Sequence, residues 1–316
     1  MPDKKIIAVV GATGAQGGGV VRAILADKNG PFTARALTRD PKSEKARALA
    51  AAGAEVVQAD VDDVESLKRA FAGAYGAYCV TFFWAHMSAE KEIAEAHAMA
   101  QAAKQAQLQH VIWSTFEDTR DWVPLSDTRM PTLQGKYKVA HFDGKAEANA
   151  EFTRLGVPTT FLYTSFYWEN LIYFGSGPQK GPDGTLAITY PMGDKKLPGI
   201  ASEDIGKAAY GIFKRGKEFI GKTVGVAGEH LTGKQMAEQL TKALGKEVRY
   251  NDVPADVFRG FGFPGADDVG NMFQFKRDFE KDYTANRSLE VTRSLDPELQ
   301  TFSQWLAKNK DRIPLG

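Results

Sequence analysis

Residues 6–17 read IIAVVGATGAQG and carry the clearest structural signal in the chain. The short aliphatic run at its start is typical of a strand that is buried on both faces. Glycines follow at positions 11, 14 and 17, and apolar residues at helical spacing come next. A glycine-rich turn between a strand and a helix lets the backbone approach a pyrophosphate, which the helix N-terminus then binds. The stretch predicts a dinucleotide loop formed by Gly11, Ala12, Thr13, Gly14, Ala15, Gln16 and Gly17.

Strand and helix signals alternate up to about residue 165. Apolar and β-branched runs predict strands at residues 6–10, 33–38, 55–59, 77–82, 110–114 and 159–163. Besides the helix after the glycine turn, the spacing of apolar residues predicts helices at 43–52, 64–71, 88–107 and 140–155. Strands that alternate with helices pair in parallel through right-handed crossovers. We therefore expect an α/β fold with a Rossmann-type, doubly wound parallel sheet.

The regular pattern ends near residue 165, and we expect a domain boundary there. Residues 1–165 are predicted to form the nucleotide-binding domain, completed by strands from residues 186–230. Residues 166–316 contain Gly- and Pro-rich loop signals and an aromatic segment at 258–275 without a clear period. They predict a smaller, mixed α+β C-terminal lobe, which either supplies substrate or partner selectivity or serves packing alone.

Composition excludes several classes of protein. The chain has 316 residues, 40 Lys and Arg against 39 Asp and Glu, and a formal net charge of +1. This balance leaves no basic stripe for direct nucleic-acid binding. The single cysteine, Cys79, excludes an internal disulfide framework and a cysteine-based metal cluster, so no metal site is expected. Because neither a secretory signal nor a membrane-spanning stretch is recognisable, the sequence predicts a cytoplasmic protein.

The end of the second predicted strand indicates which dinucleotide binds. An acidic residue there would accept from the ribose of NAD, but the sequence reads Thr38-Arg39-Asp40. The planar fork of Arg39 suits a 2′-phosphate and therefore favours NADP, although an exposed Arg39 paired with Asp40 is the alternative. After the third strand, Asp60 and Val61 are placed to contact adenine, while Asp60 or a following aspartate could instead cap the next helix.

Seven segments together resemble the NmrA-like family of atypical short-chain dehydrogenase/reductases, and within it the human-type NADPH redox sensors. The segments at 140–145 and 262–266 are the most specific of them. They read VGATGAQGG (residues 10–18), TRDP (38–41), GAEVVQ (53–58), AHFDGK (140–145), ENL (169–171), GFPGA (262–266) and NMF (271–273).

The resemblance implies that NADP(H) is held by residues 11–16, Arg39 and Asp60. It also implies cofactor contacts from three further places, namely the loop after the fourth strand, a lysine in the helix at 140–155, and the segment after the sixth strand. These contacts involve Thr81, Phe82, Phe83, Lys145, Ser165, Phe166 and Tyr167. In one respect the sequence departs from this pattern, because Ala94 stands where the human-type proteins carry a lysine.

Reductases of this superfamily use a tyrosine acid four residues before the lysine, one helical turn away. That position is His141 here, and the nearest tyrosine, Tyr137, faces Lys145 only if the helix begins early. His141 is a candidate proton donor or a structural residue. Because isoflavone-reductase-like relatives work with a catalytic lysine and no such tyrosine, Lys145 remains a catalytic candidate. Ser114 and Thr115 occupy the hydroxyl-donor region or cap the strand.

Aromatic residues are dense in the segment after the sixth strand and in the loop after the fourth. Together they predict either an apolar pocket or a core between the lobes. They are Tyr163, Phe166, Tyr167, Trp168, Tyr173, Phe174, Phe82, Phe83 and Trp84.

The sequence thus favours an NADP(H)-binding redox sensor or regulator that responds to the NADPH/NADP ratio, because the binding residues are complete while the tyrosine acid is missing. The alternative is an NADPH-dependent reductase of a small apolar carbonyl, quinone or enone that uses Lys145. A partner of transcription regulators is a third class. Candidate partners are a small apolar substrate, a regulatory protein and a second copy of the chain in a homodimer.

Overall fold

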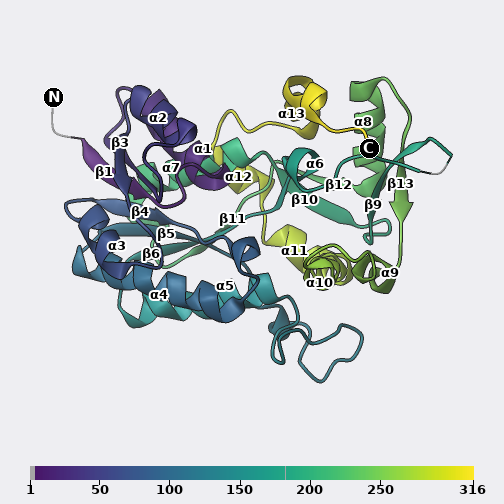
Figure 1. Cartoon of the computed structure of the whole chain (residues 1–316), viewed down its shortest axis with the longest axis horizontal. Coiled ribbons are helices and arrows are strands. Elements are labelled where there is room, and N and C mark those ends of the chain that lie inside the picture. Colours follow the sequence, from purple (N-terminus) through teal and green to yellow (C-terminus); the bar gives the residue numbers. More distant parts are fainter. Residues whose placement is uncertain (1–3, 182) are drawn as a thin grey trace. The chain divides into compact units, whose positions relative to one another are not determined.

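The computed structural model describes residues 4–181 and 183–316 (Figure 1). The chain divides into two compact units. Unit 1 contains residues 4–118, 141–163 and 203–224, and unit 2 contains residues 119–140, 164–202 and 225–316. The sequence predicts a single boundary near residue 165, whereas the two units alternate along the chain.

Unit 1 is built on a seven-stranded sheet in the order β11-β6-β5-β4-β1-β2-β3. The register of β1 to β6 is parallel throughout. This is the doubly wound order, and all six predicted strands are confirmed. The strands are β1 (Lys5–Val9), β2 (Phe32–Thr38), β3 (Glu55–Gln58), β4 (Gly76–Cys79), β5 (His110–Thr115), β6 (Thr159–Tyr163) and β11 (Thr223–Gly225).

Helices cover both faces of this sheet, with α3, α4 and α5 on one face and α1, α2 and α7 on the other (Figure 1). A short 3₁₀ turn, η1 (Phe83–Ala85), follows β4, and another, η3 (Gly216–Glu218), follows α7. The helices are α1 (Ala15–Ala26), α2 (Glu44–Ala51), α3 (Val64–Phe71), α4 (Ala89–Gln105), α5 (Ala140–Arg154) and α7 (Ser202–Arg215).

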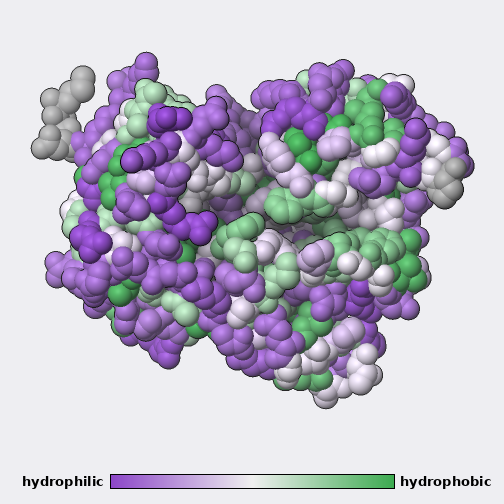
Figure 2. All heavy atoms as spheres, in the orientation of Figure 1, coloured by the Kyte–Doolittle hydropathy of each residue, from purple (hydrophilic) through white to green (hydrophobic). Residues whose placement is uncertain are grey.

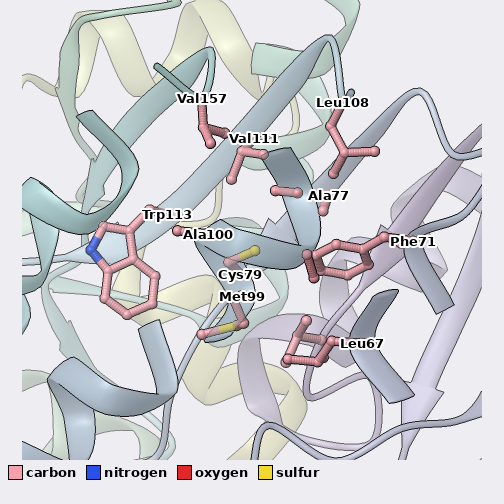
Figure 3. Close-up of a cluster of buried hydrophobic side chains, with 14 of the residues drawn as sticks. Leu67, Phe71, Ala77, Cys79, Met99, Ala100, Leu108, Val111, Trp113 and Val157 are labelled. Atoms are coloured by element: carbon pink, nitrogen blue, oxygen red, sulfur yellow. The ribbon is translucent and has the colours of Figure 1, made fainter. Parts of the chain in front are cut away.

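The core beneath α3 and α4 is close-packed (Figure 3). Phe71 from α3, Met99 from α4 and Trp113 from β5 belong to this cluster, and each is completely buried. Cys79 of β4 lies among them, and burial raises the pKa of its thiol far above the usual range. The cysteine therefore behaves as a small apolar core residue, as the sequence predicts.

The N-terminus of α3 is capped by Asp63, whose carboxylate accepts hydrogen bonds from the N–H groups of Glu65 (3.0 Å) and Ser66 (3.1 Å). We expect Asp63→Ala to lower the free energy of unfolding by about 1 kcal/mol, the usual cost of losing such a cap. The control is Asp62→Ala, which removes only an exposed ion pair with Lys91 and should cost less than about 0.5 kcal/mol. Chemical unfolding measures both, and equal losses would contradict the assignment of the cap.

Unit 2 is a mixed α+β unit with two three-stranded sheets, β12-β10-β7 and β13-β9-β8. Of the strands in residues 186–230, β11 joins the large sheet, and the others belong to these small ones. The strands are β7 (Phe166–Tyr167), β8 (Gln179–Lys180), β9 (Leu186–Tyr190), β10 (Lys196–Ile200), β12 (Glu229–Thr232) and β13 (Val248–Asp252).

Short helices make up most of the rest of unit 2. Between its sheets and helices, Trp305 donates from Nε1 to Glu169 Oε1 at 3.0 Å, and Ser202 N donates to the other oxygen of Glu169 at 2.9 Å. The helices are α6 (Asn170–Tyr173), α8 (Gly233–Leu244), α9 (Ala255–Arg259), α10 (Ala266–Asp278), α11 (Glu280–Ala285), α12 (Leu289–Leu295), α13 (Phe302–Asn309) and the 3₁₀ turns η2 (Thr119–Asp121) and η4 (Lys310–Arg312).

The exterior of unit 1 is polar where its helices face solvent. Figure 2 shows mostly hydrophilic residues, in purple, over α3 and α4. Within residues 4–181 and 183–316, no helix combines the length and the apolar character needed to cross a membrane.

Candidate functional site

The loop between β1 and α1 has the tight backbone geometry that a dinucleotide requires. Gly11 has φ of +64°, a left-handed conformation that favours glycine. A Cβ on Gly17 would lie 2.4 Å from Gly11 O and 2.8 Å from Val10 O, so the first turn of α1 is packed directly on the loop. Among the described residues, no side chain caps this helix at Gly14, and its first turn holds no acidic residue. The free N–H groups from Ala15 onward can therefore bind phosphate, and a dinucleotide fits the residues present.

Arg39 lies just after β2 with an exposed side chain. Its backbone carbonyl accepts from Gln58 Nε2 at 3.2 Å. Asp40 Oδ1 accepts from Lys42 N at 2.8 Å in a turn beside Thr38, and no ion pair between Asp40 and Arg39 is present among the described residues. The alternative of an Arg39–Asp40 pair is thus not seen in the part of the chain that the structure describes, and the contact of Arg39 with a 2′-phosphate stays a prediction. In residues 4–181 and 183–316 no hydrogen bond or ion pair engages the guanidinium, which leaves it open to an anion.

Asp60 lies in the turn after β3. Its Oδ1 accepts from Asp62 N at 3.1 Å, and its own N–H donates to Ser66 Oγ at 3.0 Å. Since Asp63 caps the following helix, Asp60 is not the cap. The turn holds Asp60 and Val61 rigidly at the carboxyl edge of the sheet, and their contact with adenine stays a prediction.

Gln16 connects the glycine loop to the neighbouring strands. Its Oε1 accepts from the hydroxyl groups of Tyr78, in β4, and of Ser114, in β5, the latter at 2.8 Å. Thr115 donates to the backbone carbonyl of Lys145 at 2.9 Å. Ser114 and Thr115 are thus tied to the loop and to α5. The role of Tyr78 was not predicted, because a tyrosine in a buried strand gives no sequence signal beyond its apolar ring.

Lys145 is buried at the carboxyl end of β4. Its Nζ lies 2.8 Å from Glu92 Oε2, and the two side chains are 8% and 0% exposed. The same ammonium donates to Thr81 Oγ1, lies 3.4 Å from Thr81 O, and sits 5.3 Å from the ring centroid of Trp113. The structure therefore holds a positive charge in place beside the glycine loop, since Val80, the neighbour of Thr81, lies 3.2 Å from the Cβ position of Gly11.

The partner of Lys145 was missed from the sequence, although a signal exists. Glu92 and Glu95 follow the same helical stripe as Ala96 and Met99, which face the core of unit 1. Two carboxylates at core-facing positions need a cationic or hydrogen-bonding partner. Burial, followed by the charge of Glu92, raises the pKa of Glu95 to about 7.

His141 is surrounded by aromatic rings. Its ring centroid lies 5.8 Å from Phe83, 5.0 Å from Trp84, 6.1 Å from Phe116 and 4.7 Å from Phe142. The side chain is nearly buried. This packing supports a structural role, and a role as proton donor stays a prediction.

Tyr137 does not continue the helical face of His141 and Lys145. Helix α5 begins at Ala140, and Tyr137 forms an isolated bridge with Leu133 before it. The tyrosine acid of the superfamily is therefore not replaced by Tyr137.

The aromatic residues of the loop after β4 differ in their exposure to solvent. Phe83 is buried, whereas Phe82 is 57% exposed. The predicted strand at 77–82 ends at Cys79, because the chain turns into η1 after Val80 and Thr81. Ala94 is exposed on α4. Cofactor contacts from Phe82 and Phe83 stay predictions.

Ser165, Phe166 and Tyr167 belong to unit 2. Ser165 Oγ donates to Val226 O at 2.5 Å, and the Tyr167 hydroxyl lies 3.2 Å from Thr164 Oγ1. Phe166 is buried. Their contact with the dinucleotide stays a prediction.

The aromatic residues after the sixth predicted strand, which lie in unit 2, do not form one cluster there. Trp168 packs against Phe302 and Trp305 with ring centroids 5.3 and 6.2 Å away, and it is core. Tyr173 and Phe174 are instead among the most exposed large apolar residues. Trp168 thus packs inside unit 2, and the predicted pocket or core between the lobes stays a prediction.

Comparison with known proteins agrees with the geometry. The family model described as the NmrA-like family matches residues 3–306. The NmrA-like family domain-containing oxidoreductase lnbB of Aspergillus flavus is 30% identical over 290 residues, which are 86% of this chain and 83% of that protein. The oxidoreductase FrzB of a Cladobotryum species is 30% identical over 284 residues, 85% of this chain and 83% of that protein.

Solved structures show the same fold. The negative transcriptional regulator Nmra in complex with NADP superimposes with a TM-score of 0.75 at 24% identity, covering 96% of this chain and 95% of that chain. A triphenylmethane reductase of Citrobacter sp. complexed with NADP(H) gives a TM-score of 0.72 at 20% identity, covering 96% and 99%. With a family model that spans nearly its whole length, this chain belongs to the NmrA-like family.

Proposed function

We propose that this chain binds NADP(H) through unit 1 and acts as an NADPH-dependent oxidoreductase on a small apolar carbonyl, quinone or enone. The observation that carries the proposal is the buried ammonium of Lys145, held by Glu92 and Thr81 next to the glycine loop. A fixed positive charge with a transferable proton is what a carbonyl oxygen needs as it becomes an alkoxide. The curated relatives that are 30% identical are named oxidoreductases, which supports the same class.

Different residues of unit 1 would bind different parts of NADPH and the substrate. The N–H groups of α1 would hold the pyrophosphate, Arg39 the 2′-phosphate, and Lys145 a ribose hydroxyl together with the substrate oxygen. When bound, NADPH supplies the hydride, and the protein supplies position and a proton.

A redox sensor that responds to the NADPH/NADP ratio is the second candidate. It is favoured by His141, which stands in the place of the tyrosine acid and is enclosed by rings. A structural neighbour is described as a negative transcriptional regulator, which makes such a role compatible with the fold. NADPH consumption with a panel of quinones, enones and aldehydes separates the two, since a sensor binds NADPH and turns over none of them.

Arg39→Ala tests the preference for NADP(H). We expect the Kd for NADPH to rise about 10- to 100-fold and the Kd for NADH to stay within about twofold, because a charge-assisted bond to the 2′-phosphate is worth about 1.5–3 kcal/mol. Fluorescence titration of the full chain measures both constants.

The matched control is Arg154→Ala, which removes the same charge from the C-terminal end of α5, where Arg154 pairs with Glu151. It should leave both constants unchanged. If Arg39→Ala binds NADPH as the parent does, the proposed 2′-phosphate site is wrong.

A further inference from the structure

Three further titratable side chains lie next to Lys145. Glu92 and Glu95 are one turn apart on α4, and His86 lies in the loop before that helix. Their ligating atoms all lie within 4.8 Å of one another. Glu92 is completely buried, and neither of its carboxylate oxygens has a hydrogen-bond donor among the described residues, although Oε2 forms the ion pair with Lys145.

The composition of this cluster suits a transition metal, but its hydrogen bonds do not. Ser88 N donates to His86 Nδ1 at 3.1 Å, so the proton of the neutral ring is on Nε2. Nε2 is the atom that faces Glu95 Oε1, at 3.6 Å, and a metal bound there would move the ring proton to Nδ1, where it would oppose the N–H of Ser88. The ammonium of Lys145 already supplies the positive charge beside Glu92. The cluster is therefore an ion pair of Lys145 and Glu92 with Glu95 and His86 beside it.

We propose that Glu92 is a positioning residue for Lys145, and that the protonation of Glu95 sets how strongly the ammonium is held at α4. This inference rests on the proposed function, because it takes Lys145 to contact the bound dinucleotide.

The contacts of the Lys145 ammonium explain how Glu92 would position it. An ammonium group has three N–H donors on a flexible four-carbon stem. Thr81 Oγ1 accepts one of them, Thr81 O, at 3.4 Å, is a weak acceptor that a ligand hydroxyl can replace, and Glu92 Oε2 lies 2.8 Å from Nζ as the counter-ion. Glu92 is the charged partner in this set, so its attraction dominates the position of Nζ.

Glu95 adds a charge to this set that depends on pH. Burial raises its pKa to about 7, so it is neutral below that pH and negative above it. An ionised Glu95 places a second carboxylate beside Glu92, which draws the ammonium toward α4 and away from a ligand. The groups that face Glu95 are Glu92, Asp62, Lys91, Lys145 and the neutral His86.

The first test is the pH profile of NADPH binding by the full chain. We expect the Kd of the parent to rise about 5- to 10-fold between about pH 6 and about pH 8.5, as Glu95 ionises. Glu95→Gln should remove most of this rise. Ionisation of the NADPH phosphates affects both proteins equally, so the difference between the two profiles isolates Glu95. Parallel profiles would overturn the role of Glu95.

The second test asks whether Glu92 acts through Lys145. Glu92→Gln should raise the Kd for NADPH about 10-fold in the parent and by less than about twofold in a Lys145→Met background. Glu92→Asp, which keeps the charge, should recover part of the affinity. The matched control is Glu90→Gln, the same change at an exposed position of α4, with no effect expected. An equal loss in both backgrounds would show a merely structural role and overturn the proposal.

Three outcomes separate the two levels of inference. If the parent binds no NADPH, the proposed function fails and the positioning role falls with it. If the parent binds and Glu92→Gln binds equally well, the positioning role alone fails. Tight Zn²⁺ binding by the parent that Glu92→Gln abolishes would replace it with a metal site. If Glu92→Gln folds poorly, the NADPH affinity of Glu92→Asp and the pH profile of NADPH binding by Glu95→Gln test the proposal instead.

Discussion

Replacing Gly17 with alanine is expected to weaken NADPH binding by more than about 100-fold, the order of loss that follows from displacing a binding group by about 1 Å. The added Cβ would lie 2.4 Å from Gly11 O and 2.7 Å from Gly11 C, both in the backbone. Neither atom can move away without shifting the loop or the first turn of α1. The N–H groups that would face the pyrophosphate are displaced with them. Titration with NADPH measures the loss.

Gly18→Ala is the matched control, one residue further along the same helix. Its Cβ would lie 3.0 Å from Nη1 of Arg22, the end of a flexible side chain, and 3.2 Å from Ala12 O. We expect a change in Kd of less than about fivefold, since both variants gain the same helix propensity. Circular dichroism confirms that each variant is folded. If the Kd of Gly17→Ala for NADPH also stays within about fivefold of the parent's, the loop does not hold the pyrophosphate.

Lys145→Met is expected to lower the free energy of unfolding by about 3 kcal/mol or more, because removing one partner of a buried ion pair leaves an uncompensated charge. Methionine keeps most of the apolar stem that packs near Trp113, so the loss reports charge rather than volume. Glu92, with no exposed surface, is the charge left behind. Chemical unfolding measures the loss of stability.

The double variant Lys145→Met/Glu92→Gln should recover the stability to within about 1 kcal/mol of the parent, since a neutral amide replaces the orphaned charge. Lys91→Met is the control for loss of a lysine on an exposed surface, where its ion pair with Asp62 is worth less than about 1 kcal/mol. A double variant no more stable than Lys145→Met would mean that Glu92 is not the source of the loss.

The sheet of unit 1 could be predicted from sequence because each strand is a short apolar run between a turn signal and a helical pattern. The end of β4 could not. Val80 and Thr81 continue the apolar run of the strand, yet Val80 packs on the glycine loop and Thr81 binds Lys145. A strand that ends at a ligand site looks the same in sequence as one that continues.

The grouping of residues 119–140 with unit 2 depends on contacts that sequence patterns do not report. Asn271 donates to the carbonyl groups of Pro131 (2.9 Å) and Lys138 (2.6 Å), and Gln274 donates to that of Arg129 (3.0 Å). The donors are more than a hundred residues away from the acceptors. Glu92 is a different case from these contacts. Its position on a core-facing stripe of α4 can be seen in the sequence, whereas its pairing with Lys145 cannot.

The alternation of the two units along the chain has a consequence for synthesis on the ribosome. Strand β11, which pairs with β6 at the edge of the large sheet, begins at Thr223, about 60 residues after β6 ends at Tyr163. At ordinary translation rates the nascent chain spends roughly 3 to 12 s with the outer edge of β6 unpaired. Such an edge can pair with strands of other chains, so this interval is when the emerging chain is most exposed to edge-to-edge association. A chain truncated before residue 223 would lack β11, and the outer edge of β6 would stay unpaired in it.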